Sequence, residues 1–191
     1  MNILIAVPTF ENIAPECFKA IYNLKGDGLS FDYVKGYDCA KARNEIAKKA
    51  LQGFDYVLMV DSDIVIPDTS LLDMLESPVN VCFGVYPRKK KTGETELFKE
   101  DSFDFKNRYT FEELNGMDQN RIVVKGSGFG CALIKTDVFK NLEYPWFEFH
   151  SYDNGTFLSE DLSFCMKASA LYPLFADLRV RCGHIAKTVQ Y

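Results

Sequence analysis

The sequence predicts an α/β protein with a mostly parallel central sheet and helices on both of its faces. Short apolar runs rich in β-branched residues alternate with stretches whose apolar residues recur every three or four positions. The apolar runs are hydrophobic at successive positions, which indicates strands buried on both sides. Of the 191 residues, 47% are hydrophobic and 26% are charged, a composition typical of one globular domain with a sizeable core. We therefore expect a single domain over residues 1–191.

The first half of the chain, residues 1–86, alternates expected strands with expected helices. The strands are at residues 3–7, 33–34, 56–60 and 79–83. Each helix is marked by an apolar stripe: Cys17, Ile21 and Leu24 after Pro15; Ala42, Ile46, Ala50 and Leu51; and Leu71, Leu72 and Leu75 after Asp68. Strands that alternate with amphipathic helices predict a Rossmann-like, doubly wound half-domain.

The second half, residues 87–191, begins without a clear pattern. Over residues 87–120 the sequence is dominated by Lys, Glu, Asp, Asn and Thr with scattered Phe, so we expect an irregular insertion there. Strands are expected again at residues 122–124 and 132–134. The last helix is expected to begin at Ser159, where helical apolar spacing resumes.

The charge balance argues against several classes of function. The 22 Lys and Arg residues against 27 Asp and Glu residues give a net charge of −5, so we expect no nucleic-acid or anionic-membrane partner. The apolar residues 2–7 follow no basic segment, and they do not resemble a secretory signal. No run approaches the roughly 20 apolar residues of a transmembrane helix.

The six cysteines have no spacing typical of metal ligands. They form no CxxC pair and lie mostly within apolar stretches. We therefore expect reduced, buried thiols in a cytoplasmic protein, and no structural zinc.

The most informative segment follows the expected strand at residues 56–60. There Asp61-Ser62-Asp63 interrupts an otherwise apolar run, so the strand ends at the carboxyl edge of the sheet, where ligands bind in open α/β folds. Two carboxylates in such a crevice repel each other, and a divalent cation is the usual counter-charge. The alternative is a solvated turn in which one of the two aspartates caps a neighbouring element.

Asp61-Ser62-Asp63 resembles the DxD motif of the GT-A-fold glycosyltransferases of family 2 and their relatives, which use nucleotide-sugar donors. Other segments resemble further motifs of these enzymes in the same order: Ala42-Arg43-Asn44; the acceptor-side segment at residues 125–134 with residues 137–139 and 145–147; Ser159-Glu160-Asp161, which resembles xED; and Arg181-Cys182-Gly183-His184. The resemblance spans residues 1 to about 187. It implies a GT-A fold with a nucleotide-binding half at residues 1–86 and an acceptor-side half at residues 87–191.

The resemblance implies a donor site built from several segments. Its residues would be Pro8, Thr9, Phe10 and Glu11 around the nucleoside, Arg43 on the diphosphate, and Asp61 with Ser62. Glu11 can accept hydrogen bonds from a base or ribose, Phe10 can stack, and a guanidinium suits a diphosphate. The alternatives are an ordinary loop after Pro8 and a surface ion pair at Arg43.

The resemblance also implies a metal site at Asp61, Asp63 and His184. Neutral imidazole is a good ligand for Mn²⁺, which we expect to be preferred over Mg²⁺. The alternative for His184 is a structural or surface histidine.

Asp161 is the expected general base and Glu160 its neighbour that orients the acceptor or the loop, as the xED resemblance implies. A general base contributes about 10² to 10⁴ in rate. Both residues also suit the first turn of a helix through its dipole, with no catalytic role.

The acceptor site is the least defined. Gly128 would leave room beside the donor sugar, and Trp146 and His150, with nearby phenylalanines, would form a platform for a sugar ring. The alternatives are a tight turn at the glycines and a plain aromatic core. The basic run at residues 88–91 is expected to be either a flap attracted to the diphosphate or a solvated loop. The acceptor site would come from residues 87–158, from a partner, or from a second subunit of a homo-oligomer.

The combined expectation is a metal-dependent glycosyltransferase, of hexosyltransferase type, acting on a UDP- or GDP-sugar. It would transfer the sugar to a carbohydrate or another hydroxyl acceptor. A sugar nucleotidyltransferase is an alternative, although a Gly-rich, Lys-containing loop is missing after the first strand. A non-catalytic nucleotide-sugar-binding module is another.

Overall fold

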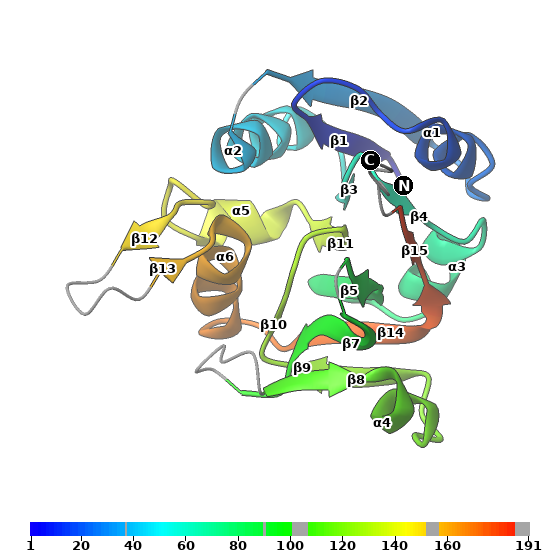
Figure 1. Ribbon diagram of the computed structural model, residues 1–191. Helices are drawn as coiled ribbons and strands as arrows, with labels where there is room; N and C mark the ends of the chain where they lie inside the picture. The colour runs from blue at the N-terminus through cyan, green and yellow to red at the C-terminus, as the bar shows by residue number, and fades with distance from the viewer. Residues whose placement is uncertain (37, 90, 101–106, 152–156, 186–191) are drawn as a thin grey trace, which may run out of the picture.

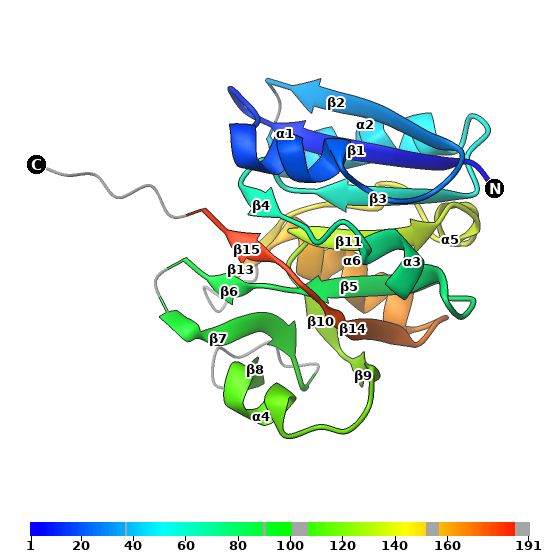
Figure 2. The same ribbon diagram turned by 90° about the vertical axis from the view of Figure 1, so that its right-hand side faces the viewer.

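The computed structural model describes residues 1–36, 38–89, 91–100, 107–151 and 157–185. Across these ranges the centre of the molecule is a seven-stranded sheet (Figures 1 and 2). In spatial order its strands are β2 (Leu29–Lys35), β1 (Ile3–Thr9), β3 (Tyr56–Val60), β11 (Cys131–Lys135), β5 (Val81–Val85), β14 (Leu174–Arg181) and β9 (Arg121–Val124).

The sheet is mostly parallel, as the sequence predicts. β2, β1, β3, β5 and β14 run in one direction, whereas β11 and β9 run in the other. β11 is inserted antiparallel between β3 and β5. The residues before β11 therefore reach the same sheet edge as the residues after β3 and β5.

Helices cover both faces of the sheet. α1 (Pro15–Tyr22) and α3 (Ser70–Leu75) lie on one face, and α2 (Cys39–Ala50) and α6 (Glu160–Ser169) on the other (Figure 2). Side chains of β1 alternate between two cores, since Leu4 and Ala6 pack with α2 whereas Ile3 and Ile5 pack with α1. This burial on both sides explains why β1 is apolar throughout.

Phenylalanine rings fill the core between α6 and the sheet. Phe164 of α6 stacks on Phe147 with ring centroids 4.8 Å apart and meets Phe129 edge-on at 5.2 Å. The short helix α5 (Asp137–Asn141) adds Phe139 to this cluster. Because Phe129 also lies in the pocket wall described below, the core and the site share a side chain.

Residues 87–120 are not irregular, which corrects the expectation. They contain β6 (Pro87–Arg88), β7 (Lys91–Phe98), β8 (Arg108–Thr110) and α4 (Phe111–Asn115), and β7 pairs with β6, β8 and β10 (Gly126–Ser127). The charged residues that suggested a solvated loop are paired: Arg88 with Glu94 and Glu96, and Arg108 with Glu96. Residues 101–106 of this segment lie outside the described ranges.

Two smaller pairings complete the fold. β15 (Gly183–His184) pairs antiparallel with β4 (Ile64–Val65), so that His184 lies opposite Ile64, directly after the acidic motif. β12 (His150–Ser151) pairs with β13 (Phe157–Leu158) in a hairpin before α6. Within the described ranges, no helix is both long and apolar enough to cross a membrane.

The phenylalanine cluster predicts a large stability difference between two positions of α6. Phe164→Ala removes a fully buried ring and should lower the free energy of unfolding by about 3 to 5 kcal/mol. Met166→Ala, at an exposed position of the same helix, should change it by less than about 0.5 kcal/mol. Urea unfolding followed by circular dichroism measures both, and equal effects would contradict this assignment of the core.

Candidate functional site

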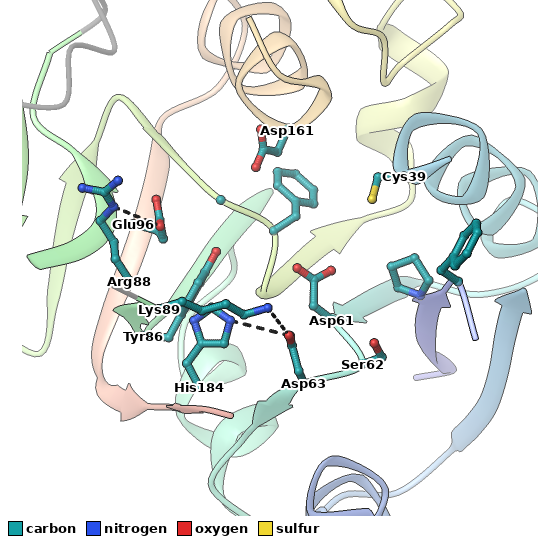
Figure 3. Close-up of a pocket in the computed structure, with 14 residues that line it drawn as sticks. Cys39, Asp61, Ser62, Asp63, Tyr86, Arg88, Lys89, Glu96, Asp161 and His184 are labelled. Atoms are coloured by element: carbon teal, nitrogen blue, oxygen red, sulfur yellow. Dashed lines mark ion pairs between the residues drawn. The ribbon is translucent and has the colours of Figure 1, made fainter. Parts of the chain in front are cut away.

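A pocket of about 600 Å³ opens at the carboxyl edge of the central sheet (Figure 3). Its wall carries four carboxylates and three cationic or imidazole side chains: Asp61, Asp63, Glu96, Asp161, Arg88, Lys89 and His184. They come from the end of β3, from β6, β7 and their turn, from α6 and from β15. The sheet topology creates this convergence, because parallel strands end at one edge and β11 begins there.

Arg43 lies beneath this pocket rather than in its wall. The side chain projects from α2, and the residue is only 3% exposed. One guanidinium nitrogen donates to Asp61 Oδ1 at 2.7 Å, another donates to Glu160 Oε1, and the group lies 5.6 Å from the centre of the Phe129 ring. Burial works to lower the pKa of Arg43, but Asp61 and Glu160 raise it, so the group stays charged. Arg43 is therefore not the exposed ion pair of the alternative, and its expected contact with a diphosphate stays a prediction.

Glu160 is likewise a buried partner of Arg43 and does not line the pocket. Burial raises the pKa of Glu160, although Arg43 opposes this. Its carboxylate pairs with Arg43 beneath the pocket, and its expected role in orienting the acceptor stays a prediction. Arg43 and Glu160 are positioning residues that join α2, α6 and the end of β3.

Asp161, the next residue of α6, does face the pocket (Figure 3). Its Oδ1 accepts hydrogen bonds from the Ser159 hydroxyl and, at 2.8 Å, from the Leu162 backbone N–H. A Cβ placed at Gly128 would lie 3.5 Å from Oδ2, so the second oxygen faces the wall formed by Gly128. One oxygen of Asp161 is thus fixed while the other is directed into the site.

Asp63 and His184 meet at the opposite end of the pocket (Figure 3). His184 Nδ1 lies 2.7 Å from the Pro87 carbonyl oxygen, which can only accept a hydrogen bond, so Nδ1 carries the hydrogen. Nε2 faces Asp63 Oδ1, 3.6 Å away: in the protonated ring its N–H is directed at this carboxylate, whereas in the neutral ring its lone pair is available to a cation. A histidine held in this way by a backbone carbonyl is typical of metal ligands, and together with carboxylates it suits a divalent cation.

Lys89 shares the same carboxylate, since its Nζ lies 2.5 Å from Asp63 Oδ2. The hydrogen bond from His184, with the contribution of Lys89, lowers the pKa of Asp63 to about 2. Partial burial works to lower the pKa of His184, but Asp63 and the Pro87 carbonyl raise it. Among the described residues, no three His, Cys, Asp or Glu side chains gather closely enough to hold a metal ion by themselves.

The expected nucleoside residues divide between two hollows. Pro8, Phe10, Asp61 and Ser62 line the main pocket, and Phe10 is 75% exposed. Thr9 and Glu11 instead line a neighbouring cavity of about 240 Å³ beside Tyr33. These residues flank the end of β1 and remain candidates for a nucleoside.

Only Gly128 of the expected acceptor residues lies in the pocket wall. A Cβ there would clash with the Tyr86 hydroxyl, which explains the glycine. Trp146 is 7% exposed, and its indole N–H donates to the Phe139 carbonyl at 2.8 Å, so it belongs to the core. His150 lies on β12, 3.4 Å from Glu148, and does not line the pocket. Neither residue belongs to the pocket wall, and the aromatic platform stays a prediction.

Asn44, the polar residue that follows Arg43 in α2, is buried and hydrogen-bonded to the backbone. Its side-chain oxygen accepts from the backbone N–H groups of Trp146 and Phe147, and its amide donates to the carbonyls of Ala40 and Phe147. The three-residue motif at 42–44 is thus a packing motif that connects α2 to the acidic motif, α6 and the segment at 146–147.

Sequence reasoning missed three pocket residues: Cys39, Tyr86 and Glu96. Tyr86 accepts a hydrogen bond from the Gly130 N–H at 3.0 Å, and its position directly after β5 was a usable signal. Glu96 lies on β7, which the sequence does not predict, so nothing pointed to it. Cys39 is the exposed exception to the buried thiols that the sequence predicts.

No protein-family model matches the sequence, and no curated protein matches it either. Solved structures do match. A197 from STIV superposes with a TM-score of 0.69 at 15% identity, over 98% of this chain and 87% of that one. The structure of GalNAc-T7 with UDP, GalNAc and Mn²⁺ superposes with a TM-score of 0.69 at 9% identity. The structure of S. aureus TarS 1-349 with UDP-GlcNAc superposes with a TM-score of 0.57 at 15% identity.

The match covers 99% of this chain against GalNAc-T7 and 100% against TarS, but only 44% and 62% of those chains. The chain thus spans less than two thirds of either structure. The likeness extends over nearly all of this chain, and it confirms the predicted fold: the chain has the GT-A glycosyltransferase fold.

The buried ion pairs of Arg43 predict a strong stability effect. Arg43→Met should lower the free energy of unfolding by about 3 to 5 kcal/mol, because it leaves Asp61 and Glu160 without their cation. Lys49→Met, at an exposed ion pair of the same helix, should cost less than about 1 kcal/mol. Urea unfolding at pH 7 compares the two variants.

The Arg43→Met deficit should shrink as the pH falls. Burial already raises the pKa values of Asp61 and Glu160 in the folded protein, and losing Arg43 raises them further. The folded state then binds protons more tightly than the unfolded state, so acid stabilises the variant relative to wild type. A deficit that stays constant between pH 7 and pH 5 would contradict the assigned pairing.

Cys39 should be the thiol that reacts in the native protein. Partial burial of its thiol raises the pKa of Cys39, so alkylation at pH 8 should be slower than that of free cysteine and rise about tenfold per pH unit. The five buried cysteines should react only on unfolding. Mass spectrometry after iodoacetamide treatment tests this, and Cys39→Ser should abolish native labelling.

Proposed function

We propose that this chain, with its GT-A fold, is a metal-dependent glycosyltransferase that moves a hexose from a nucleoside-diphosphate sugar to a hydroxyl acceptor. The observation that carries the proposal is the arrangement of the pocket in Figure 3. Asp161 stands at one end of it and the pair of Asp63 and His184 at the other. This separation suits a displacement in which an acceptor enters on one side and a diphosphate leaves on the other.

Donor binding is supported by the size and position of the pocket. About 600 Å³ is within the range of small-molecule sites, and the pocket lies at the carboxyl edge where α/β folds bind nucleotides. Pro8 and Phe10 would contact the nucleoside, and Asp61 and Ser62 the ribose side. The GalNAc-T7 and TarS structures reported above contain UDP and UDP-GlcNAc, which favours a UDP-sugar.

Asp63 and His184 would hold a divalent cation, and Asp61 would lie beside it. When bound, such a cation supplies Lewis-acid stabilisation of the charge on a diphosphate leaving group. Because no three protein ligands are gathered among the described residues, oxygen atoms of the donor would complete the coordination. The Mn²⁺ in the GalNAc-T7 structure supports the choice of Mn²⁺.

Asp161 is the proposed general base. Ser159 and Leu162 hold its Oδ1, so Oδ2 is the oxygen that would take the proton from the acceptor hydroxyl. Gly128 keeps that side of the pocket open, and Tyr86 and Glu96 line the wall beside it. Attack from the Asp161 end, opposite the diphosphate, would invert the anomeric configuration.

Nucleotide binding is the first test. In the presence of Mn²⁺, UDP at about 100 times its Kd should raise the free energy of unfolding by roughly 2.7 kcal/mol. For a chain of this size that should raise the Tm by about 5 to 10 °C in thermal unfolding. EDTA should remove the shift. GDP, CDP and ADP with their sugars serve as comparisons, and the absence of any shift would overturn the proposal.

Two variants separate the proposed roles. Asp63→Ala should abolish the Mn²⁺-dependent shift. Asp161→Asn should keep it and slow release of nucleoside diphosphate from the donor sugar by about 10² to 10⁴. Asp137→Asn, at an exposed position outside the pocket, is the control. Equal loss of binding in both variants would contradict the roles, and pyrophosphate release from a nucleoside triphosphate would instead indicate a nucleotidyltransferase.

A further inference from the structure

Lys89 occupies a position that the proposed reaction does not yet use. It lies in the turn between β6 and β7, and its ammonium contacts Asp63 Oδ2 at 2.5 Å. The other oxygen of Asp63 faces His184 Nε2 at 3.6 Å. Both carboxylate oxygens of the expected metal ligand therefore already face a nitrogen (Figure 3).

The neighbouring basic residue is engaged elsewhere. Arg88 pairs with Glu94 at 2.6 Å and with Glu96 at 3.5 Å, and these contacts attach the strand β6 to β7. Lys89 follows directly on this anchored strand, but its side chain is 53% exposed. An exposed ammonium can therefore change partners at small cost while the backbone keeps its place.

Lys89 also lies where two hollows meet. It lines the main pocket and an adjacent cavity that contains Asn12, Ser62 and Ile185. A diphosphate that entered beside Asp63 would bring two or more negative oxygens within reach of this ammonium. Such oxygens offer Lys89 an alternative partner to Asp63.

A divalent cation and Lys89 compete for the same carboxylate. Without a nucleotide, a cation at Asp63 would meet an ammonium that is already in contact with that side chain, and like charges at such distances repel. With a diphosphate present, the ammonium has a second anion to pair with. The repulsion is then offset.

We propose that Lys89 is a positioning residue that couples donor binding to metal binding. It neutralises Asp63 when the pocket holds no donor, and it transfers to the diphosphate when a nucleoside diphosphate enters, which frees Asp63 for the cation. This inference rests on the proposed function. By linkage, the nucleotide then raises metal affinity and the metal raises nucleotide affinity by the same factor.

The test measures Mn²⁺ affinity directly, by the loss of the free-ion electron paramagnetic resonance signal, with and without UDP or GDP. Lys89→Gln should bind free Mn²⁺ about tenfold more tightly than wild type, and the enhancement by nucleotide should fall by a similar factor. Lys89→Arg should keep the wild-type pattern. Lys99→Gln, which directly follows β7 and is paired with Glu113 outside the pocket, is the matched control.

The outcomes distinguish this inference from the function on which it rests. If nucleotide and Mn²⁺ bind together but Lys89→Gln has the free-Mn²⁺ affinity of wild type and of Lys99→Gln, Lys89 does not couple them and the inference is overturned. If no nucleotide binds to any variant with any metal, the proposed function fails and the inference fails with it.

Discussion

The site depends on one buried cation. Arg43 is enclosed beneath the pocket and pairs with Asp61 after β3 and with Glu160 at the start of α6. A guanidinium removed from water must keep its partners, because an unpaired buried charge is far more costly than the pair. The guanidinium thereby holds α2, the end of β3 and the start of α6 together. Asp61 and Asp161 are positioned in the pocket wall by these ion pairs beneath it.

The charges of the pocket are arranged by element. Lys89 lies in the turn between β6 and β7, and His184 lies on β15. Both side chains contact Asp63. Asp161 stands apart from them on α6, with one oxygen fixed by its own helix turn. The pocket thus has one end that suits an anion with a cation beside it and another end that suits a proton acceptor. The fold creates these two ends, because the carboxyl ends of the strands and the start of α6 lie at the same edge of the sheet.

Much of the fold and part of the site could be predicted from local pattern. Continuous apolar runs and helical stripes were enough for β1, β3, β5 and the main helices, and the acidic motif was correctly expected at a sheet edge. The segment 87–120 was misjudged, because the pairing of Arg88, Glu94, Glu96 and Arg108 makes a charged sequence suitable for a sheet. The burial of Trp146 and Arg43 could not be predicted, because residue type alone does not say whether a side chain lies in a pocket wall or in the core behind it.

The sequence by itself determined the α/β class, the carboxyl-edge location of Asp61 and Asp63, and the order of the motifs, since these follow from hydrophobic periodicity and from where apolar runs end. Tertiary structure decided which of these residues face the pocket. The antiparallel insertion of β11 and the pairing of β15 with β4 bring Gly128 and His184 to that edge, and both contacts join segments distant in the chain. Local periodicity contains no information on such pairings, because they arise from the packing of whole elements.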